Sequence, residues 1–191
     1  MSRQSPSQTV GPFFHPALID VQAQNDLVTP QTQGERIIIT GRVLDGDGVA
    51  VPDAMIEVWQ ADYQGIYPHP NDPRHTEAAP HFRGFGRVDT WQTGDTFTLR
   101  TIRPGPVPWD DTIMQAPHIN VRVFARGMLI HAVTRIYFAG EPANAADPVL
   151  SRSDSARRET LIAQQEDTGD LPTYRFDIHL QGDSETVFFN P

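Results

Sequence analysis

The chain has 191 residues, of which 38% are hydrophobic and 20% charged, a composition typical of one folded domain rather than a disordered segment. Fifteen basic against 24 acidic residues give a formal net charge of −9, which disfavours binding to nucleic acid or to an anionic membrane. The lack of cysteine excludes disulfides, thiolate metal sites and cysteine nucleophiles.

The first ten residues carry no apolar segment of the signal-peptide type, and the sequence has no run of about 18 apolar residues. We therefore expect a cytoplasmic protein. The 17 prolines and 14 glycines favour a loop-rich all-β fold over a helical one.

Residues 1–35 are polar, contain proline and lack periodicity, so they are predicted to form an N-terminal arm. Two adjacent aromatic residues, Phe13 and Phe14, indicate that this arm packs on its own domain or on a partner. Residues 36–191 are predicted to form one domain.

Segments rich in β-branched residues or with alternating polarity predict the strands of this domain. They lie at 37–44, 54–60, 96–102, 118–124, 128–138, 174–181 and 185–189. Residues 61–95 are rich in turn formers, which predicts a long loop with at most a short strand, and residues 154–165 are the single predicted helix. The expected fold is all-β: a β-sandwich core with an extended N-terminal arm and one or two short helices.

Seven histidines without any cysteine suggest a metal site. Residues i and i+2 of a strand share a face, so His-x-His on a strand directs two imidazoles at one ion. Here the triplet is His118-Ile119-Asn120, and asparagine is a poor transition-metal ligand. His118 is therefore either a ligand or a hydrogen-bonded strand histidine. The loop histidines His69, His75 and His81 are candidates for a surface metal site, although their spacing fits no ligand pattern.

Several motifs resemble the intradiol ring-cleavage dioxygenases. They are WQAD at 59–62, GIY at 65–67, TIRPG at 101–105, PHIN at 117–120 and YRFDI at 174–178. Three others resemble one chain type of the heteromeric members: PSQTVGPF at 6–13, FARG at 124–127 and ETVFF at 185–189. The motifs occur in the family's order over nearly the whole chain, and the resemblance implies a β-sandwich fold.

The resemblance also identifies the residues of this chain that stand at the family's metal-ligand positions. Family members that hold metal bind one ferric ion through two tyrosinates and two histidines. Carried over residue by residue, those four positions are Tyr67, Val107, His118 and Asn120, which we call the degenerate metal position. Two donors are retained and two are lost, and the arginine that precedes the first histidine in catalytic chains is also missing. The resemblance therefore implies that this chain holds no metal.

In heteromeric members, Fe(III) belongs to one of two homologous chains, and the active site lies at their interface. The resemblance implies that this is the iron-free chain, that its partner is the iron-bearing beta subunit, and that no catalytic residue lies in this chain alone. It would line the pocket for a small aromatic substrate with Thr9, Gly11, Pro12 and Arg126. A glycine lets backbone approach a ring closely, a proline fixes the adjoining turn, and an arginine holds an anionic group.

Two other functions stay open on the sequence. One is a β-sandwich binding or assembly module with no catalytic role. The other is a self-contained metalloenzyme that uses Tyr67 and His118 with further ligands. The sequence also leaves open whether water, an anion or side chains occupy the degenerate metal position.

Overall fold

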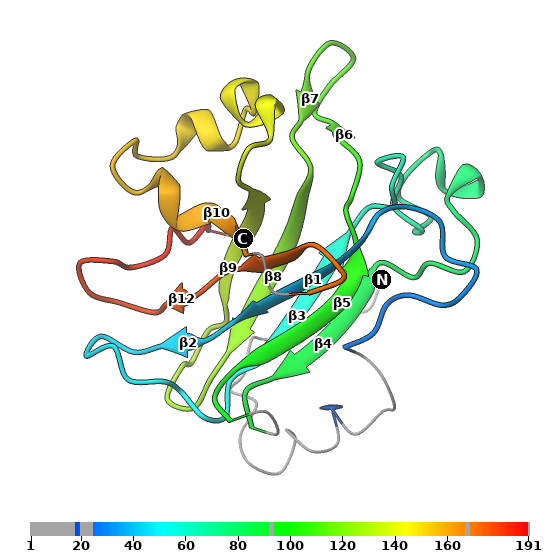
Figure 1. Cartoon of the computed structure of the whole chain (residues 1–191). Helices are drawn as coiled ribbons and strands as arrows, with labels where there is room; N and C mark the ends of the chain where they lie inside the picture. The colour runs from blue at the N-terminus through cyan, green and yellow to red at the C-terminus, as the bar shows by residue number, and fades with distance from the viewer. Residues whose placement is uncertain (1–17, 20–24, 92–93, 167–168, 191) are drawn as a thin grey trace, which may run out of the picture.

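The computed structural model describes residues 18–19, 25–91, 94–166 and 169–190 (Figure 1). Eight strands form one sheet in the order β4-β3-β8-β9-β10-β11-β1-β5, and its two edge strands contact each other, so the sheet is nearly closed. The strands are β1 (Arg36–Gly41), β3 (Met55–Gln60), β4 (Phe85–Asp89), β5 (Phe97–Ile102), β8 (His118–Phe124), β9 (Ala132–Phe138), β10 (Ile162–Glu166) and β11 (Thr173–Arg175).

Two smaller sheets extend this one. Strand β2 (Val43–Leu44) pairs in parallel with β12 (Ile178–His179), and β6 (Val107–Pro108) pairs with β7 (Met114–Gln115) in a hairpin that projects from one end of the molecule (Figure 1). Within the described elements the helices are short 3-10 turns: η1 (His75–Glu77), η2 (Pro142–Ala146), η3 (Leu150–Arg152) and η4 (Arg158–Leu161). None of the described helices is long and apolar enough to span a membrane.

One core lies between the two halves of the curled sheet. Side chains from β1, such as Ile37 and Ile39, pack in the same buried cluster as Val121 of β8 and Phe138 of β9. The period-two alternation of a strand directs these residues inward, and each fully buried aliphatic side chain contributes about 1.5–3 kcal/mol. The predicted all-β class with a sandwich-like core and short helices is confirmed.

The predicted helix at 154–165 is wrong. The segment forms η4 and then β10, which runs parallel to β9 and antiparallel to β11. The carboxylate of Asp154 does accept a hydrogen bond from the Ala156 amide, as a helix cap would. The strands on either side provide hydrogen-bond partners for the following residues, and this tertiary pairing overrides the local helical pattern.

Several predicted strands differ in extent. The segment 37–44 divides at Arg42, whose amide donates to Asp177 Oδ1 at 2.8 Å, and 174–181 divides at the same crossing into β11 and β12. The strand expected at 128–138 begins only at Ala132, and 185–189 makes one isolated bridge, Val133 to Phe189. The short strand expected within 61–95 is β4.

The described end of the predicted arm packs on the domain itself. The Leu27 amide donates to the Arg100 carbonyl of β5 at 2.8 Å, and the Leu27 side chain is buried in the core. The division at residue 35 stays a prediction.

Candidate active-site remnant

A row of three side chains crosses β3, β8 and β9 on the face of the sheet opposite the core. Trp59 lies opposite Asn120, and Asn120 lies opposite Arg135. Directly opposed residues of antiparallel strands point to the same side, with Cβ atoms roughly 5 Å apart. This register forms the floor on which the remaining site residues are placed.

Tyr67 lies against this floor. Its ring stacks on Trp59 with ring centroids 5.5 Å apart, and its Oη accepts a hydrogen bond from Asn120 Nδ2 at 3.0 Å. The second amide hydrogen of Asn120 is donated to the Trp59 carbonyl at 3.2 Å. Burial raises the pKa of Tyr67 above its ordinary value, while the Asn120 hydrogen bond and the Arg135 charge oppose that rise. Tyr67 is therefore a neutral phenol near pH 7.

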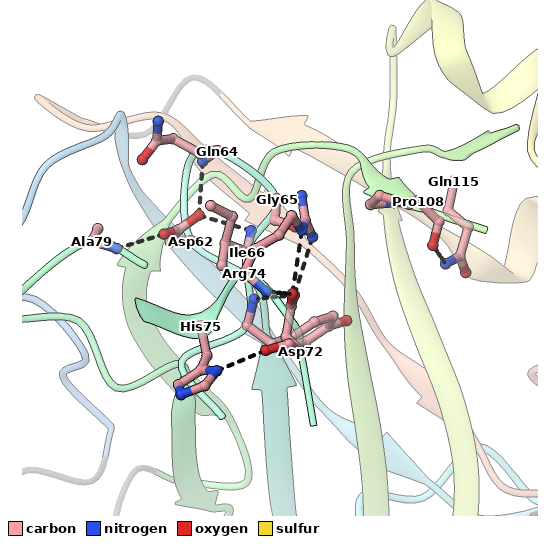
Figure 2. A network of polar contacts seen from close by, with 11 residues as sticks. Asp62, Gln64, Gly65, Ile66, Asp72, Arg74, His75, Ala79, Pro108 and Gln115 are labelled. Carbon is pink, nitrogen blue, oxygen red and sulfur yellow. Dashed lines mark hydrogen bonds and ion pairs between the residues drawn. The ribbon is translucent and has the colours of Figure 1, made fainter. Parts of the chain in front are cut away.

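Two carboxylates hold the loop that carries Tyr67. Figure 2 shows Asp62 among the amides of Gln64, Ile66 and Ala79, which donate to its carboxylate at 2.7–2.9 Å. Asp62 is fully buried, and these three donors satisfy its charge.

The second carboxylate of the loop is Asp72, which accepts a hydrogen bond from the Tyr67 amide at 3.1 Å. Asp72 also accepts hydrogen bonds from the Arg74 side chain (Figure 2). Arg74 Nη2 also donates to the Gly65 carbonyl at 2.7 Å, so the pair joins both ends of the turn. The hydrogen bonds to Arg74 and Tyr67 hold the pKa of Asp72 below its ordinary value, although its partial burial acts in the opposite direction.

A cavity of about 630 Å³ opens beside Tyr67. Its lining residues come from the Tyr67 loop, from β3 and from β6: Trp59, Tyr67, His69, Asn71, Asp72, Pro73, Arg74, Val107 and Pro108. The Pro108 carbonyl accepts from Gln115 Nε2 at 3.3 Å, which ties the β6–β7 hairpin together (Figure 2). Two of the four degenerate metal positions, Tyr67 and Val107, therefore face one cavity.

His118 is buried at the start of β8, and only 1% of its surface is exposed. Its Nδ1 lies 2.7 Å from the Ala116 carbonyl, and because a carbonyl oxygen accepts only, Nδ1 carries the hydrogen. Burial, assisted by the Arg135 charge, lowers the pKa of His118 from 6.5 to about 4. The imidazole is therefore neutral at pH 7, with its lone pair on Nε2, the tautomer that suits a metal ligand.

Arg135 belongs to the same polar group, although the sequence analysis did not select it. Its Nη1 donates to Gln115 Oε1 at 2.8 Å and to Tyr137 Oη at 3.3 Å. Tyr137 in turn donates to the buried carboxylate of Asp147 at 3.2 Å. Pairing the predicted strands 118–124 and 128–138 in the observed register would have placed Arg135 beside Asn120.

These side chains do not match the donor set of a ferric ion. Val107 offers no donor, and both amide hydrogens of Asn120 are already hydrogen-bonded. Tyr67 is a protonated phenol, which leaves the His118 Nε2 as the one nitrogen of the ligand type. Of the four positions, Tyr67 and Asn120 are joined by a hydrogen bond, Tyr67 and Val107 line one cavity, and His118 is hydrogen-bonded to the Ala116 carbonyl.

Arg126 lies at the far end of β8 from His118. Eight residues of extended chain separate the two, which corresponds to roughly 25 Å. Arg126 forms an ion pair with Asp53 at 2.7 Å, its side chain is 69% exposed, and it lines a separate cavity of about 550 Å³ with Gly127 and Met128. Within this chain, Arg126 therefore cannot act on the same ligand as Tyr67.

The other expected pocket residues, Thr9, Gly11 and Pro12, lie outside the described residues. Of the loop histidines, His69 packs edge-on against Trp59 beside the cavity, whereas His75 lies exposed in η1. Among the described residues, no group of three or more histidines and carboxylates is placed to hold a metal.

Comparison with known proteins identifies the family to which this chain belongs. A family model described as dioxygenase matches residues 10–182. The chain is 43% identical to the protocatechuate 3,4-dioxygenase alpha chain of Burkholderia cepacia, with 98% of each chain covered. The chain belongs to the intradiol dioxygenase family. Another intradiol dioxygenase relative is the protocatechuate 3,4-dioxygenase beta chain of the same organism, 33% identical over 94% of this chain and 77% of that one.

A solved structure of similar fold is the dioxygenase domain of a dioxygenase–carbohydrate-binding protein fusion from Streptomyces sp. SirexAA-E. It superposes with a TM-score of 0.64 at 28% identity and covers 94% of this chain and 99% of that domain. The intradiol dioxygenase membership expected from the motifs at 59–67 and 117–120 is confirmed.

Proposed function

We propose that this chain is the iron-free alpha subunit of a heteromeric protocatechuate 3,4-dioxygenase. The assembled enzyme inserts both atoms of dioxygen into protocatechuate and opens the ring between its two hydroxyls, giving 3-carboxy-cis,cis-muconate. The Fe(III) is held by a beta subunit, which is homologous to this chain. The 43% identity to an alpha chain over 98% of both chains supports the subunit type.

One observation carries the proposal. Where a catalytic chain needs a tyrosinate and a histidine, this chain has Val107 and Asn120, and Asn120 donates a hydrogen bond to the tyrosine that is retained. A phenol that accepts this bond and keeps its own proton is not prepared to bind a hard cation. The cluster has become a structural element, and this favours a supporting role over a self-contained metalloenzyme.

The part assigned to this chain is positioning. When bound in the partner, Fe(III) supplies the activation of the aromatic diol toward dioxygen. Gly11 and Pro12 would form a backbone wall that approaches the ring closely and keeps water out, with Thr9 beside them. Arg126 would hold the anionic substrate, because its guanidinium is exposed and, within the part of the chain that the structure describes, forms an ion pair with Asp53 alone.

The test measures iron content and ring-cleavage activity of the purified chain alone and after mixing with the iron-bearing beta subunit. We expect no stoichiometric iron and no turnover alone, and turnover in the complex. Stoichiometric iron with a tyrosinate charge-transfer colour in this chain alone would establish the metalloenzyme instead. A complex in which this chain adds nothing to the activity of the beta subunit would support the assembly module.

The role of Arg126 is tested in the complex by Arg126→Ala. We expect kcat/KM for protocatechuate to fall by about 10-fold or more, because a charge-assisted contact to the substrate contributes roughly 1.5–3 kcal/mol. The chain should still fold, with a loss of no more than about 1–3 kcal/mol, since the Arg126 side chain is 69% exposed but the Asp53 carboxylate that loses its partner is only 18% exposed. Arg122→Ala, which removes an exposed arginine from the middle of β8, is the control. Equal kinetics for the two variants would remove Arg126 from the pocket.

A further inference from the structure

Arg135 is a cationic side chain beside the degenerate metal position. It lies directly opposite Asn120 across the β8–β9 ladder, on the same face of the sheet. Its guanidinium is partly buried and is held at one end by Gln115 Oε1, 2.8 Å from Nη1. The side chain is therefore fixed beside the site rather than extended into solvent.

The contacts of this guanidinium reach the other positions as well. Gln115 pairs with Val107 across the β6–β7 hairpin, so its bond to Arg135 links the charge to the strand of the lost tyrosine. Tyr137, the second acceptor of Nη1, lies opposite His118, and their ring centroids are 5.7 Å apart. Arg135 thus lies opposite Asn120, and a single intervening residue separates it from Val107 and from His118.

The fourth position, Tyr67, lies within the electrostatic influence of the same guanidinium. The guanidinium lowers the pKa of both Tyr67 and His118; its effect ranks after burial for His118, and after burial and the Asn120 hydrogen bond for Tyr67. Among the described residues, no ion pair includes Arg135. Its positive charge at the site is therefore compensated by hydrogen-bond acceptors and not by a carboxylate at ion-pair distance.

We propose that Arg135 takes over the positive charge of the metal in this chain, so that a ferric ion is excluded by a resident cation as well as by the two missing donors. This inference rests on the assignment of the four positions under the proposed function. A fixed positive charge within the same partly buried cluster repels a trivalent ion strongly, because the effective dielectric constant there is well below that of water. Restoring the two donors is then not sufficient to restore iron binding.

The experiment uses full-length chains that carry V107Y/N120H, the same pair with R135Q, and the same pair with R135K. Ferric citrate is the probe, and the readouts are iron bound per chain after desalting and the tyrosinate-to-iron absorption band. We expect R135Q to raise iron affinity by at least roughly 100-fold over V107Y/N120H. R135K keeps the charge and should leave affinity near that of V107Y/N120H, which separates charge from loss of the arginine shape.

Equal iron affinity of the chains with and without R135Q would overturn the inference, whether both bind iron or neither does. An R135K chain that binds as tightly as the R135Q chain would overturn it as well. If the four-donor chains fail to fold by circular dichroism, V107Y is compared with V107Y/R135Q under the same criteria, since this pair leaves Asn120 in place. Iron in the unsubstituted chain would instead contradict the proposed function, so the two failures are distinguishable.

Discussion

At the scale of single residues, hydrogen bonds hold the side chains of His118, Asn120 and Tyr67. The His118 Nδ1 hydrogen goes to a backbone carbonyl, and the Asn120 amide goes to the Tyr67 hydroxyl. Each bond satisfies a buried or half-buried polar group, which would otherwise cost about 1–3 kcal/mol. Tyr67 is therefore held by Asn120, and His118 is held by the Ala116 carbonyl.

The buried His118 predicts a pH dependence of stability. Its folded pKa of about 4 lies below the ordinary 6.5, so below pH 6.5 the unfolded chain binds a proton that the folded chain does not. Stability is therefore complete above pH 6.5 and falls as the pH is lowered toward 4, by about 2–3 kcal/mol between pH 7 and pH 4.5. Urea unfolding of the wild type and of His118→Gln at both pH values isolates this loss from that of the carboxylates. Parallel losses in the two proteins would contradict the assignment.

At the scale of elements, the Tyr67 loop and the segment leading into β6 cross at two glycines. Gly65 adopts a φ of +79°, and a Cβ there would lie 1.9 Å from the Pro106 carbonyl oxygen. Gly105 approaches from the other side, and its amide donates to the Asp62 carbonyl at 2.8 Å. This crossing brings Tyr67 and Val107 to one cavity, because side chains at either glycine would force the two backbones apart.

We expect Gly65→Ala to destabilise the chain by more than about 3 kcal/mol, because a positive φ and a clash with backbone act together. The matched control is Gly48→Ala, at a φ of +75° with no atom within 4 Å of the added Cβ. The free energy of unfolding of the control should fall by only about 1–2 kcal/mol, which is the cost of placing a residue with a side chain in the left-handed backbone conformation. Urea unfolding measures the stability of both variants. Equal losses of stability would contradict the prediction, because they would mean that the backbone at the crossing moves away from the added Cβ at no energetic cost.

At the scale of the whole molecule, the two ends of β8 carry different features. One end bears the degenerate metal position and the projecting β6–β7 hairpin, and the other bears the turn with Arg126 (Figure 1). Leu129 and Ile130 in that turn are 81% and 64% exposed. If Arg126 reaches the active site of the partner, these apolar neighbours must be covered in the same interface.

Leu129→Asp should therefore weaken binding of the proposed beta subunit by about 10-fold or more, since a charge would be buried in an apolar contact. Met114→Asp, at a 48% exposed position in β7 near the other end of β8, should change the affinity by less than about threefold. Isothermal titration or sedimentation of the mixed chains measures both. If Met114→Asp is instead the variant that loses affinity, the interface lies at the β6–β7 hairpin, and the proposed role of Arg126 is wrong.

Local pattern was sufficient for much of the fold. Strands 54–60, 96–102 and 118–124 agree with β3, β5 and β8 within a residue, because alternation and β-branched content reflect side-chain burial directly. The helix at 154–165 failed since that segment becomes a strand only when β9 and β11 are present on either side. The division of the predicted strand 37–44 at Arg42 likewise depends on a hydrogen bond to Asp177, a residue distant in the sequence.

The sequence by itself determined the all-β class, the family, and the presence of a valine at 107 and an asparagine at 120, because each of these depends only on which residue types occur and in what order. Only the tertiary structure decided which partners those residues have. The Asn120–Tyr67 bond joins residues 53 positions apart, and Arg135 enters the cluster through strand register. Such contacts depend on how strands pair and loops cross in space, and this information is absent from any local stretch of sequence.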